Sequence, residues 1–207
     1  MCILIRHNMN SPINIAIFAS GNGTNMQAIT DFFAHRPEAG IRPALVVSDN
    51  PDAYVLRRAE KEGIPSVVLK KSSLGDRNEV MPILEAHRIG YIILAGYLRL
   101  IPEFLLEAYP GKILNIHPAL LPKYGGKGMY GHHVHEAVKA AGEKVTGITI
   151  HEIDADYDRG KIVFQAETPI DSEADSPEDI AAKVHLLEHE FFPKTIGEWI
   201  ARKEAKK

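Results

Sequence analysis

Between residues 13 and 116 the chain alternates short β-prone runs with segments of helical periodicity, and this alternation constrains the fold more than any other feature. Turns containing glycine or proline separate the two kinds of segment. Strands that alternate with helices in this way form parallel, doubly wound sheets, so the first half is predicted to be Rossmann-like. We expect strands at 13–19, 44–47, 66–69, 91–95 and 113–116, and helices at 26–33, 53–62, 76–87 and 102–108.

The pattern changes in the second half of the chain. A helix is expected near residues 134–141. Two strand-like runs follow, at 147–153 and 162–167, and the loop that joins them suits a hairpin. The predicted fold class is therefore α/β, with a mostly parallel, doubly wound sheet and an antiparallel C-terminal portion.

The last helix has a clear start signal at Ser176. A hydroxyl cap, a proline at the first helical position and two acidic residues follow one another there. We expect this helix to end near Phe192, because Pro193 removes a backbone donor, and a second helical piece to cover 195–201. Pro82 raises the same issue, and is expected to kink its helix or to lie in the first turn.

Composition narrows the class of protein. The 207 residues, 45% of them hydrophobic, suffice for one core, so a single domain is expected. A net charge of -3 gives no electrostatic footprint for nucleic acid, and no stretch is long enough for a membrane span. Cys2 is the only cysteine, which excludes an internal disulfide and favours the cytoplasm. Residues 1–12 are expected to be an N-terminal extension, with Met9 an alternative start.

A glycine turn (residues 20–25) lies between the first predicted strand and helix. Its glycines allow backbone N–H groups to surround an anion at a helix N-terminus, so a phosphate is the natural ligand. The lysine of a P-loop is absent, Met26 replaces the third glycine of the dinucleotide fingerprint, and Asp49 lies too far along to bind a ribose in that motif. A tight turn without a ligand remains the alternative.

Asn115 and His117 are the strongest catalytic candidates. On an extended strand both side chains point to one side, while Leu114 and Ile116 enter the core. Pro118 ends the strand, which leaves the two polar groups at the carboxyl edge, where open α/β sheets bind ligands. An amide donor beside an imidazole suits addition to a carbonyl carbon. The alternative is a histidine and an asparagine that are merely satisfied at a strand end.

Asp158 is the candidate partner of His117. A nearby carboxylate raises the pKa of a histidine and favours the imidazolium form. The alternative is that Asp158 only caps a loop with Gly160.

Histidines and glycines between residues 124 and 135 allow two further interpretations. His132, His133 and His135, like His185 and His189, have the look of metal ligands, but without a cysteine or an H-E-x-x-H motif we expect no metal. These histidines then face solvent or line a pocket. The glycine-rich segment 124–131 is expected to be a mobile lid, where Lys123 and Lys127 approach a phosphate or are simply solvated.

Four separated motifs, read together, resemble the phosphoribosylglycinamide formyltransferases, folate-dependent enzymes of purine synthesis. Their order and spacing cover residues 13 to about 200. The motifs are Ser20-Gly21-Asn22-Gly23-Thr24-Asn25, Leu94-Ala95-Gly96-Tyr97-Leu98-Arg99, Leu114-Asn115-Ile116-His117-Pro118-Ala119-Leu120-Leu121-Pro122 and Asp156-Tyr157-Asp158-Arg159-Gly160.

This resemblance implies the formyltransferase fold and transfer of a formyl group from 10-formyltetrahydrofolate to the amine of glycinamide ribonucleotide, with no metal. Asn115 and protonated His117 would stabilise the oxyanion, Asp158 would keep His117 protonated, and His151 would support them. Residues 13–110 would form the phosphate-binding half and 111–207 the catalytic and folate-binding half. The matching ribonucleotide residues are Gly23, Thr24, Asn25, Met26 and Gln27. The matching folate residues are Arg77, Leu98, Arg99, Leu100, Ile101, Asn115, Asp154, Ala155, Asp156 and Tyr157.

The chain departs from this family in three places. Glu152 stands where an aromatic residue is usual, Arg159 replaces a frequent glycine, and the segment 125–131 is longer. Formyltetrahydrofolate hydrolase and methionyl-tRNA formyltransferase share the fold, but they carry a further N-terminal or C-terminal domain that we do not expect here. A noncatalytic nucleotide-binding module is the alternative from another class. The oligomeric state is left open.

Overall fold

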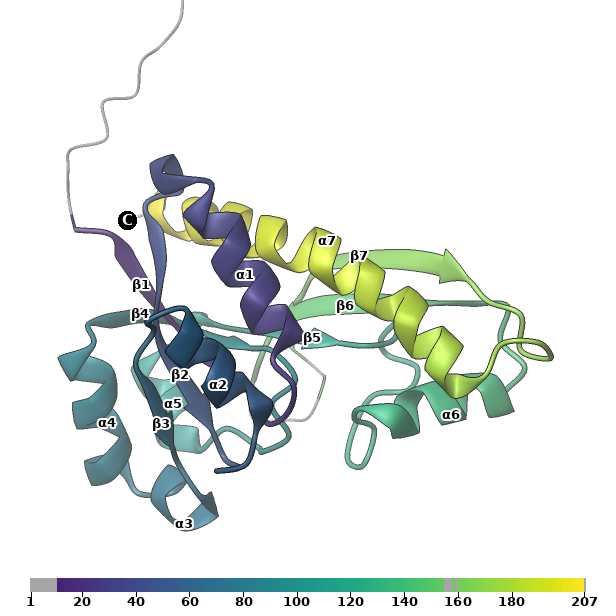
Figure 1. Cartoon of the computed structure of the whole chain (residues 1–207), viewed down its shortest axis with the longest axis horizontal. Coiled ribbons are helices and arrows are strands. Elements are labelled where there is room, and N and C mark those ends of the chain that lie inside the picture. The colour runs from purple at the N-terminus through teal and green to yellow at the C-terminus, as the bar shows by residue number, and fades with distance from the viewer. Residues whose placement is uncertain (1–10, 155–157, 159, 207) are drawn as a thin grey trace, which may run out of the picture.

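A seven-stranded sheet forms the centre of the computed structural model, which describes residues 11–154, 158 and 160–206 (Figure 1). The strand order is β3-β2-β1-β4-β5-β6-β7. Met9, Ala155, Asp156, Tyr157 and Arg159 lie outside the described residues. The strands are β1 (Ile13–Phe18), β2 (Ile41–Ser48), β3 (Ser66–Val68), β4 (Ile89–Leu94), β5 (Ile113–His117), β6 (Val145–Glu152) and β7 (Ile162–Pro169). The helices are α1 (Thr24–Ala34), η1 (Pro37–Ala39), α2 (Tyr54–Lys61), α3 (Lys71–Leu74), α4 (Arg77–Ala86), α5 (Glu103–Ala108), α6 (His132–Ala140) and α7 (Pro177–Glu204).

Strands β1 to β5 are parallel, whereas β6 is antiparallel to both β5 and β7. This arrangement confirms the predicted fold class and the hairpin between the last two strands. Because β1 lies between β2 and β4, the strand order reverses at the β1–β4 boundary. Ligands of open α/β sheets bind at the carboxyl ends of the strands beside such a reversal.

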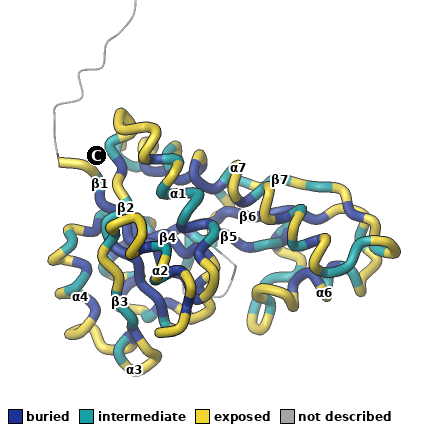
Figure 2. The backbone as a smooth tube through the Cα atoms, in the orientation of Figure 1, coloured by how far each residue is buried: buried dark blue, intermediate teal, exposed yellow. Residues whose placement is uncertain are grey.

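Alternating residues of β1 enter two separate cores. Ile15 and Ile17 pack with α1, α2 and α7 on one face, whereas Ala16 and Phe18 pack with α3, α4 and α5 on the other. All four side chains are fully buried. The centre of the sheet is therefore buried on both faces, and Figure 2 shows its buried strands beside helices with exposed outer sides, whereas the edge strand β7 is partly exposed.

The prediction that Pro193 would end the last helix is wrong. Helix α7 runs without a break for 28 residues, from Pro177 to Glu204, with Pro193 inside it. Proline removes only its own N–H bond, and the turns on both sides are held by burial of Phe192, Ile196 and Trp199. The start signal was predicted correctly, because Ser176 and Asp179 form a reciprocal capping box.

Helix α4 likewise tolerates a proline. Pro82 is the sixth of its ten residues, so it lies in the interior rather than the first turn. The other elements begin or end within a few residues of the expected limits, while η1 and α3 were not anticipated. Across residues 11–154, 158 and 160–206, none of the helices combines the length and apolarity that crossing a membrane requires.

Candidate active site

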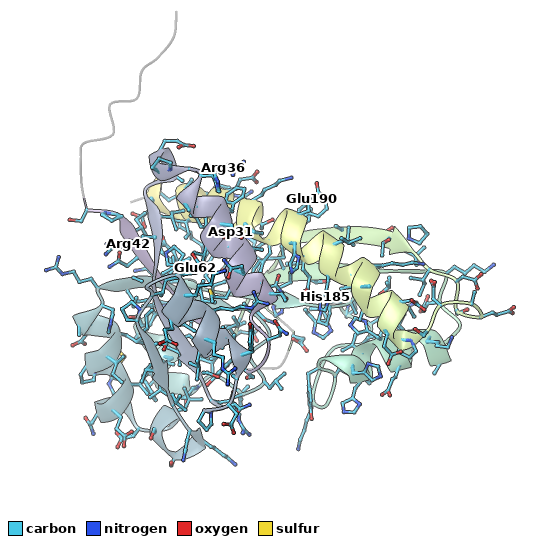
Figure 3. All side chains as sticks on the ribbon, viewed as in Figure 1. Asp31, Arg36, Arg42, Glu62, His185 and Glu190 are labelled. Atoms are coloured by element: carbon cyan, nitrogen blue, oxygen red, sulfur yellow. The ribbon has the colours of Figure 1, made fainter. Side chains whose placement is uncertain are left out.

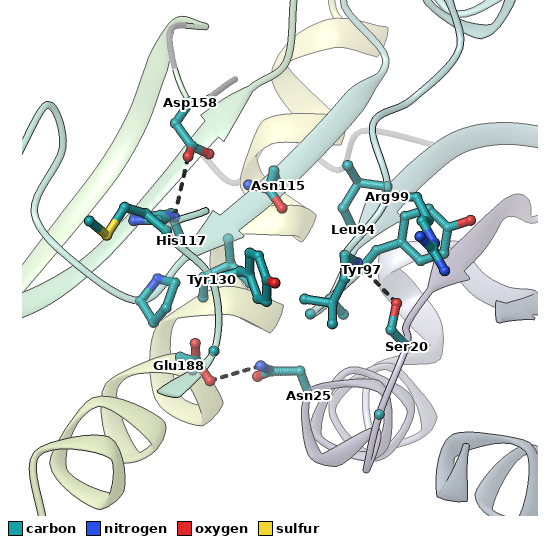
Figure 4. A pocket seen from close by; sticks show the side chains of 18 of the residues that line it. Ser20, Asn25, Leu94, Tyr97, Arg99, Asn115, His117, Tyr130, Asp158 and Glu188 are labelled. Atoms are coloured by element: carbon teal, nitrogen blue, oxygen red, sulfur yellow. Dashed lines mark hydrogen bonds and ion pairs between the residues drawn. The ribbon is translucent and has the colours of Figure 1, made fainter. Parts of the chain in front are cut away.

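A cleft of about 750 Å³ opens at the carboxyl ends of β1, β4 and β5, beside the point where the strand order reverses (Figure 4). The glycine turn, the segment 94–101 and the end of β5 line it. Residues 126–131, His151, Asp158 and the middle of α7 complete its wall. The cleft therefore brings together the phosphate-binding and catalytic candidates, which are far apart in the sequence.

The expected side-chain alternation is present on β5. Leu114 and Ile116 are buried in the core, while Asn115 and His117 line the cleft. The chain returns through β6, and Asp158 follows that strand, with its Oδ2 atom 3.7 Å from Nδ1 of His117. The two predicted partners thus face each other within the cleft rather than opening onto opposite surfaces.

The ring of His117 is held at its other nitrogen. Nε2 donates a hydrogen bond of 2.7 Å to the backbone oxygen of Tyr124. Burial lowers the pKa of His117, and this effect exceeds the opposite effects of Asp158 and of the Tyr124 hydrogen bond. The expectation that Asp158 keeps His117 protonated is therefore corrected. The carboxylate acts in the predicted direction, but burial dominates and leaves the free imidazole neutral at neutral pH.

Asp158 remains ionised in the same environment. Burial alone would raise its pKa, but the neighbouring His151 and His117 rings and the Gly126 N–H together hold it below the ordinary value. The Gly126 N–H donates to Oδ2 over 2.8 Å. A Cβ atom on Gly125 would lie 3.2 Å from the Cβ of Asp158 and 2.5 Å from Leu121, so glycine permits this close approach.

His151 connects Asn115 to the end of β6. Its Nδ1–H donates to the backbone oxygen of Glu152 over 3.1 Å, which leaves Nε2 to accept from the Asn115 amide nitrogen at 3.0 Å. These two hydrogen bonds orient the amide group of Asn115, and its second N–H makes no bond to His151. Gly160 packs against the same Glu152 oxygen so closely that a Cβ atom would lie 1.7 Å from it. His151 is thus in direct contact with the Asn115 amide.

The glycine turn leads into the N-terminus of α1 and lines the cleft. Gly23 has φ +76 and precedes α1, and Thr24 and Asn25 also line the cleft. Met26 is fully buried in the core. The Gln27 N–H bonds to the Gly23 oxygen within the helix. The Gln27 side chain reaches Asp31 and Glu62, two residues labelled in Figure 3, so Met26 and Gln27 do not line the cleft.

Most of the predicted folate residues that the structure describes lie together. The segment Leu98 to Ile101 and Asp154 line the cleft, and Leu98 and Leu100 are about half exposed. The Arg99 guanidinium is held by Asp49 at 2.7 Å. Arg77 is different: it does not line the cleft, and its guanidinium lies 3.9 Å from Glu107 on α5.

Three residues that line the cleft were not among the predicted site residues. Glu188 is 5% exposed, accepts a 2.9 Å hydrogen bond from Asn25, and has its pKa raised by burial. His135 is also buried, its Nδ1 has no hydrogen-bond partner, and burial lowers its pKa to about 4. His185 also lines the cleft. No sequence motif marks Glu188, whereas the pocket-lining alternative for the histidines does apply to His135.

The remaining histidines of this group face outward. The side chains of His132 and His133 are about half or more exposed, and both lie near Glu136. Within the part of the chain that the structure describes, no group of three or more His, Cys, Asp or Glu residues could hold a metal ion.

The fold and the cleft define the class of protein, an α/β enzyme with its site at the reversal of a doubly wound sheet. A model of the formyl transferase family matches residues 13–196. The chain belongs to this family, among its phosphoribosylglycinamide formyltransferases.

Proteins with the name phosphoribosylglycinamide formyltransferase are similar to this chain in sequence. The chain is 41% identical over 185 residues to "Phosphoribosylglycinamide formyltransferase" of Bacillus subtilis, covering 87% of this chain and 91% of the relative. It is 36% identical over 188 residues to the chloroplastic enzyme of Arabidopsis thaliana, covering 88% of this chain but only 64% of that longer relative.

Solved structures agree with this assignment. The crystal structure of phosphoribosylglycinamide formyltransferase from Bacillus halodurans has a TM-score of 0.82 and 36% identity, covering 92% of this chain and 96% of that one. Glycinamide ribonucleotide transformylase 1 from Symbiobacterium toebii has a TM-score of 0.81 and 34% identity, covering 92% and 90%. Both neighbours share the mixed sheet described above.

Proposed function

We propose that this chain transfers the formyl group of 10-formyltetrahydrofolate to the amine of glycinamide ribonucleotide. The single observation that carries the proposal is one cleft containing both an anion-binding glycine turn and the Asn115–His117–Asp158 cluster. Family membership supplies the substrates, and the cleft supplies groups suited to each. On this proposal the chain is one domain, with phosphate binding mainly in residues 13–110 and catalysis in residues 111–207.

The first step is attack on the formyl carbon. The amine lone pair forms a C–N bond, and the π electrons of the carbonyl move onto its oxygen. The Asn115 amide provides one N–H donor for this oxyanion. The attacking nitrogen then loses a proton to Nδ1 of His117, because Nε2–H is already bound to Tyr124, and this Nδ1–H is the second donor until the proton passes to N10. Loss of one such donor typically lowers the rate about 100- to 1000-fold.

The second step breaks the bond between the formyl carbon and N10 of the folate. The oxyanion electrons re-form the carbonyl, and N10 leaves with a proton that the attacking nitrogen has lost. Asp158, ionised and 3.7 Å from His117, compensates the positive charge that the ring gains as negative charge develops on the substrate. A neutral resting His117 therefore becomes cationic only when a negative charge forms beside it.

The two substrates would occupy adjoining parts of the cleft. The phosphate binds the N–H groups of the glycine turn, and the buried Glu188 carboxylate beside Asn25 accepts hydrogen bonds from the ribose. The folate ring binds along residues 98–101, where the half-exposed side chains of Leu98 and Leu100 offer apolar surface to a flat ring. Arg77 and residues 155–157 stay candidates for binding the folate. We also propose small-molecule substrates without a metal, and a cytoplasmic location.

One assay tests the reaction. The protein is mixed with 10-formyltetrahydrofolate and either glycinamide ribonucleotide or water alone, and release of tetrahydrofolate is followed. We expect release that depends on the ribonucleotide. Equal release in water would instead indicate a hydrolase, and no release in either would support a noncatalytic nucleotide-binding module.

A further inference from the structure

Helix α2 contacts three consecutive residues of the glycine turn, Gly21, Asn22 and Gly23. The Val55 N–H donates to the Gly21 oxygen over 3.1 Å. The Val55 side chain packs so tightly on Gly23 that a Cβ atom there would lie 2.5 Å from Val55 Cγ2. Arg58 holds the residue between them, Asn22. The turn is thus fixed by a second element and not by α1 alone.

Arg58 binds Asn22 through two hydrogen bonds. Its Nε donates to the backbone oxygen of Asn22 and its Nη2 to the side-chain oxygen, both over 2.9 Å. A planar guanidinium that makes two bonds fixes direction as well as distance, which a lysine ammonium cannot reproduce. The guanidinium also lies over the Tyr54 ring, 5.1 Å from its centroid.

These contacts determine which way the N–H groups of the turn point. The oxygens of Gly21, Asn22 and Gly23 are taken by Val55, Arg58 and the Gln27 N–H, respectively. In a planar trans peptide the following N–H points opposite to the C=O. The N–H groups of Asn22, Gly23 and Thr24 are therefore directed away from those partners, and all three residues line the cleft.

Arg58 also brings a positive charge that nearby acids do not neutralise. Among the residues the structure describes, no carboxylate oxygen lies within 4.0 Å of its guanidinium, and Arg58 itself does not line the cleft. Any effect on a ligand must therefore act through Asn22 or through charge at a distance.

We propose that Arg58 is a positioning residue for a phosphate monoester, because its two bonds to Asn22 orient the backbone donors of the glycine turn. The inference rests on the proposed ribonucleotide site but not on formyl transfer. Two substitutions of Arg58 separate the effect of orienting the turn from the effect of the arginine's positive charge. If orientation matters, Arg58→Lys, which keeps the charge, behaves like Arg58→Gln, which removes it.

The test measures binding of ribose 5-phosphate by calorimetry to the unaltered protein and to the variants Arg58→Lys, Arg58→Gln and Arg57→Lys. Arg57, the neighbouring exposed arginine of α2, is the matched control. We expect both Arg58 variants to bind about tenfold to a hundredfold more weakly, the range for loss of charge-assisted hydrogen bonds, and Arg57→Lys to bind like the unaltered protein. Thermal unfolding verifies that each variant is folded.

Kinetics add a second readout. The KM for glycinamide ribonucleotide should rise in both Arg58 variants, while kcat and the KM for 10-formyltetrahydrofolate stay within about threefold. Normal binding by Arg58→Lys would overturn the inference in favour of a charge effect, and normal binding by both variants would overturn it altogether. If the unaltered protein binds ribose 5-phosphate but shows no turnover, the proposed reaction fails while the inference about Arg58 is still tested.

Discussion

Replacing Asp158 by asparagine tests the electrostatic argument most directly. The substitution keeps the size of the side chain and an oxygen for the Gly126 N–H, but removes the charge opposite His117. At the observed 3.7 Å, an effective dielectric constant near 20 gives about 4.5 kcal/mol of attraction between the carboxylate and an imidazolium. Solvent and reorganisation reduce this figure, so we expect kcat to fall about 100- to 1000-fold, the range for losing an oxyanion-stabilising group.

The assay is ribonucleotide-dependent release of tetrahydrofolate at saturating substrate, with ribose 5-phosphate affinity measured alongside. Affinity should stay within about threefold, because Asp158 acts on the reacting carbonyl and not on the phosphate. Asp175→Asn is the control, since Asp175 pairs with Lys183 at the start of α7 and has no role in the proposed chemistry. A kcat for Asp158→Asn within threefold of the unaltered protein would refute the reasoning.

Three further predictions concern the support of the site. Glu152→Ala should cost about 1–3 kcal/mol of unfolding free energy in denaturant titration and shift the emission of Trp199, the only tryptophan, whose indole N–H bonds to Glu152 at 2.8 Å. Gly160→Ala should lower both the melting temperature and kcat, because its Cβ would lie 1.7 Å from the Glu152 oxygen, whereas Gly75→Ala, with contacts no closer than 3.6 Å, should not. Burial lowers the pKa of His135 from 6.5 to about 4, so its contribution to stability is present above pH 6.5 and is lost as the pH falls toward 4. Between these pH values, His135→Gln should therefore lose about 3 kcal/mol less unfolding free energy than the unaltered protein. An equal loss for both proteins in chemical denaturation would contradict this.

Periodicity sufficed for the parallel half of the fold because its central strands, β1 and β4, are buried on both faces. The runs around Ile15 and Ile93 are almost continuously apolar, and glycine or proline marks their ends. The predicted end of the helix at Pro193 was wrong because helix propensity takes no account of the buried side chains before and after this proline. Tertiary burial outweighed one missing hydrogen bond.

The candidate site was predictable where its residues share a local element. Strand alternation linked Asn115 to His117, but only the antiparallel return of β6 brings Asp158 within reach. Glu188 could not be found from the sequence, because a single acid on a long helix looks like any solvated one. The protonation state of His117 also depended on burial, a quantity that no sequence motif contains.

The unbroken course of α7 has a mechanical consequence. Glu188 accepts a hydrogen bond from Asn25 of the glycine turn, and eleven residues later Trp199 donates one to Glu152 at the end of β6. At 1.5 Å per residue the helix sets these two attachments about 17 Å apart. On the proposed function, this continuous helix sets the distance between the part of the molecule that binds one reactant and the strand that carries the reactive groups. If the helix were broken at Pro193, the distance between these two attachments would vary.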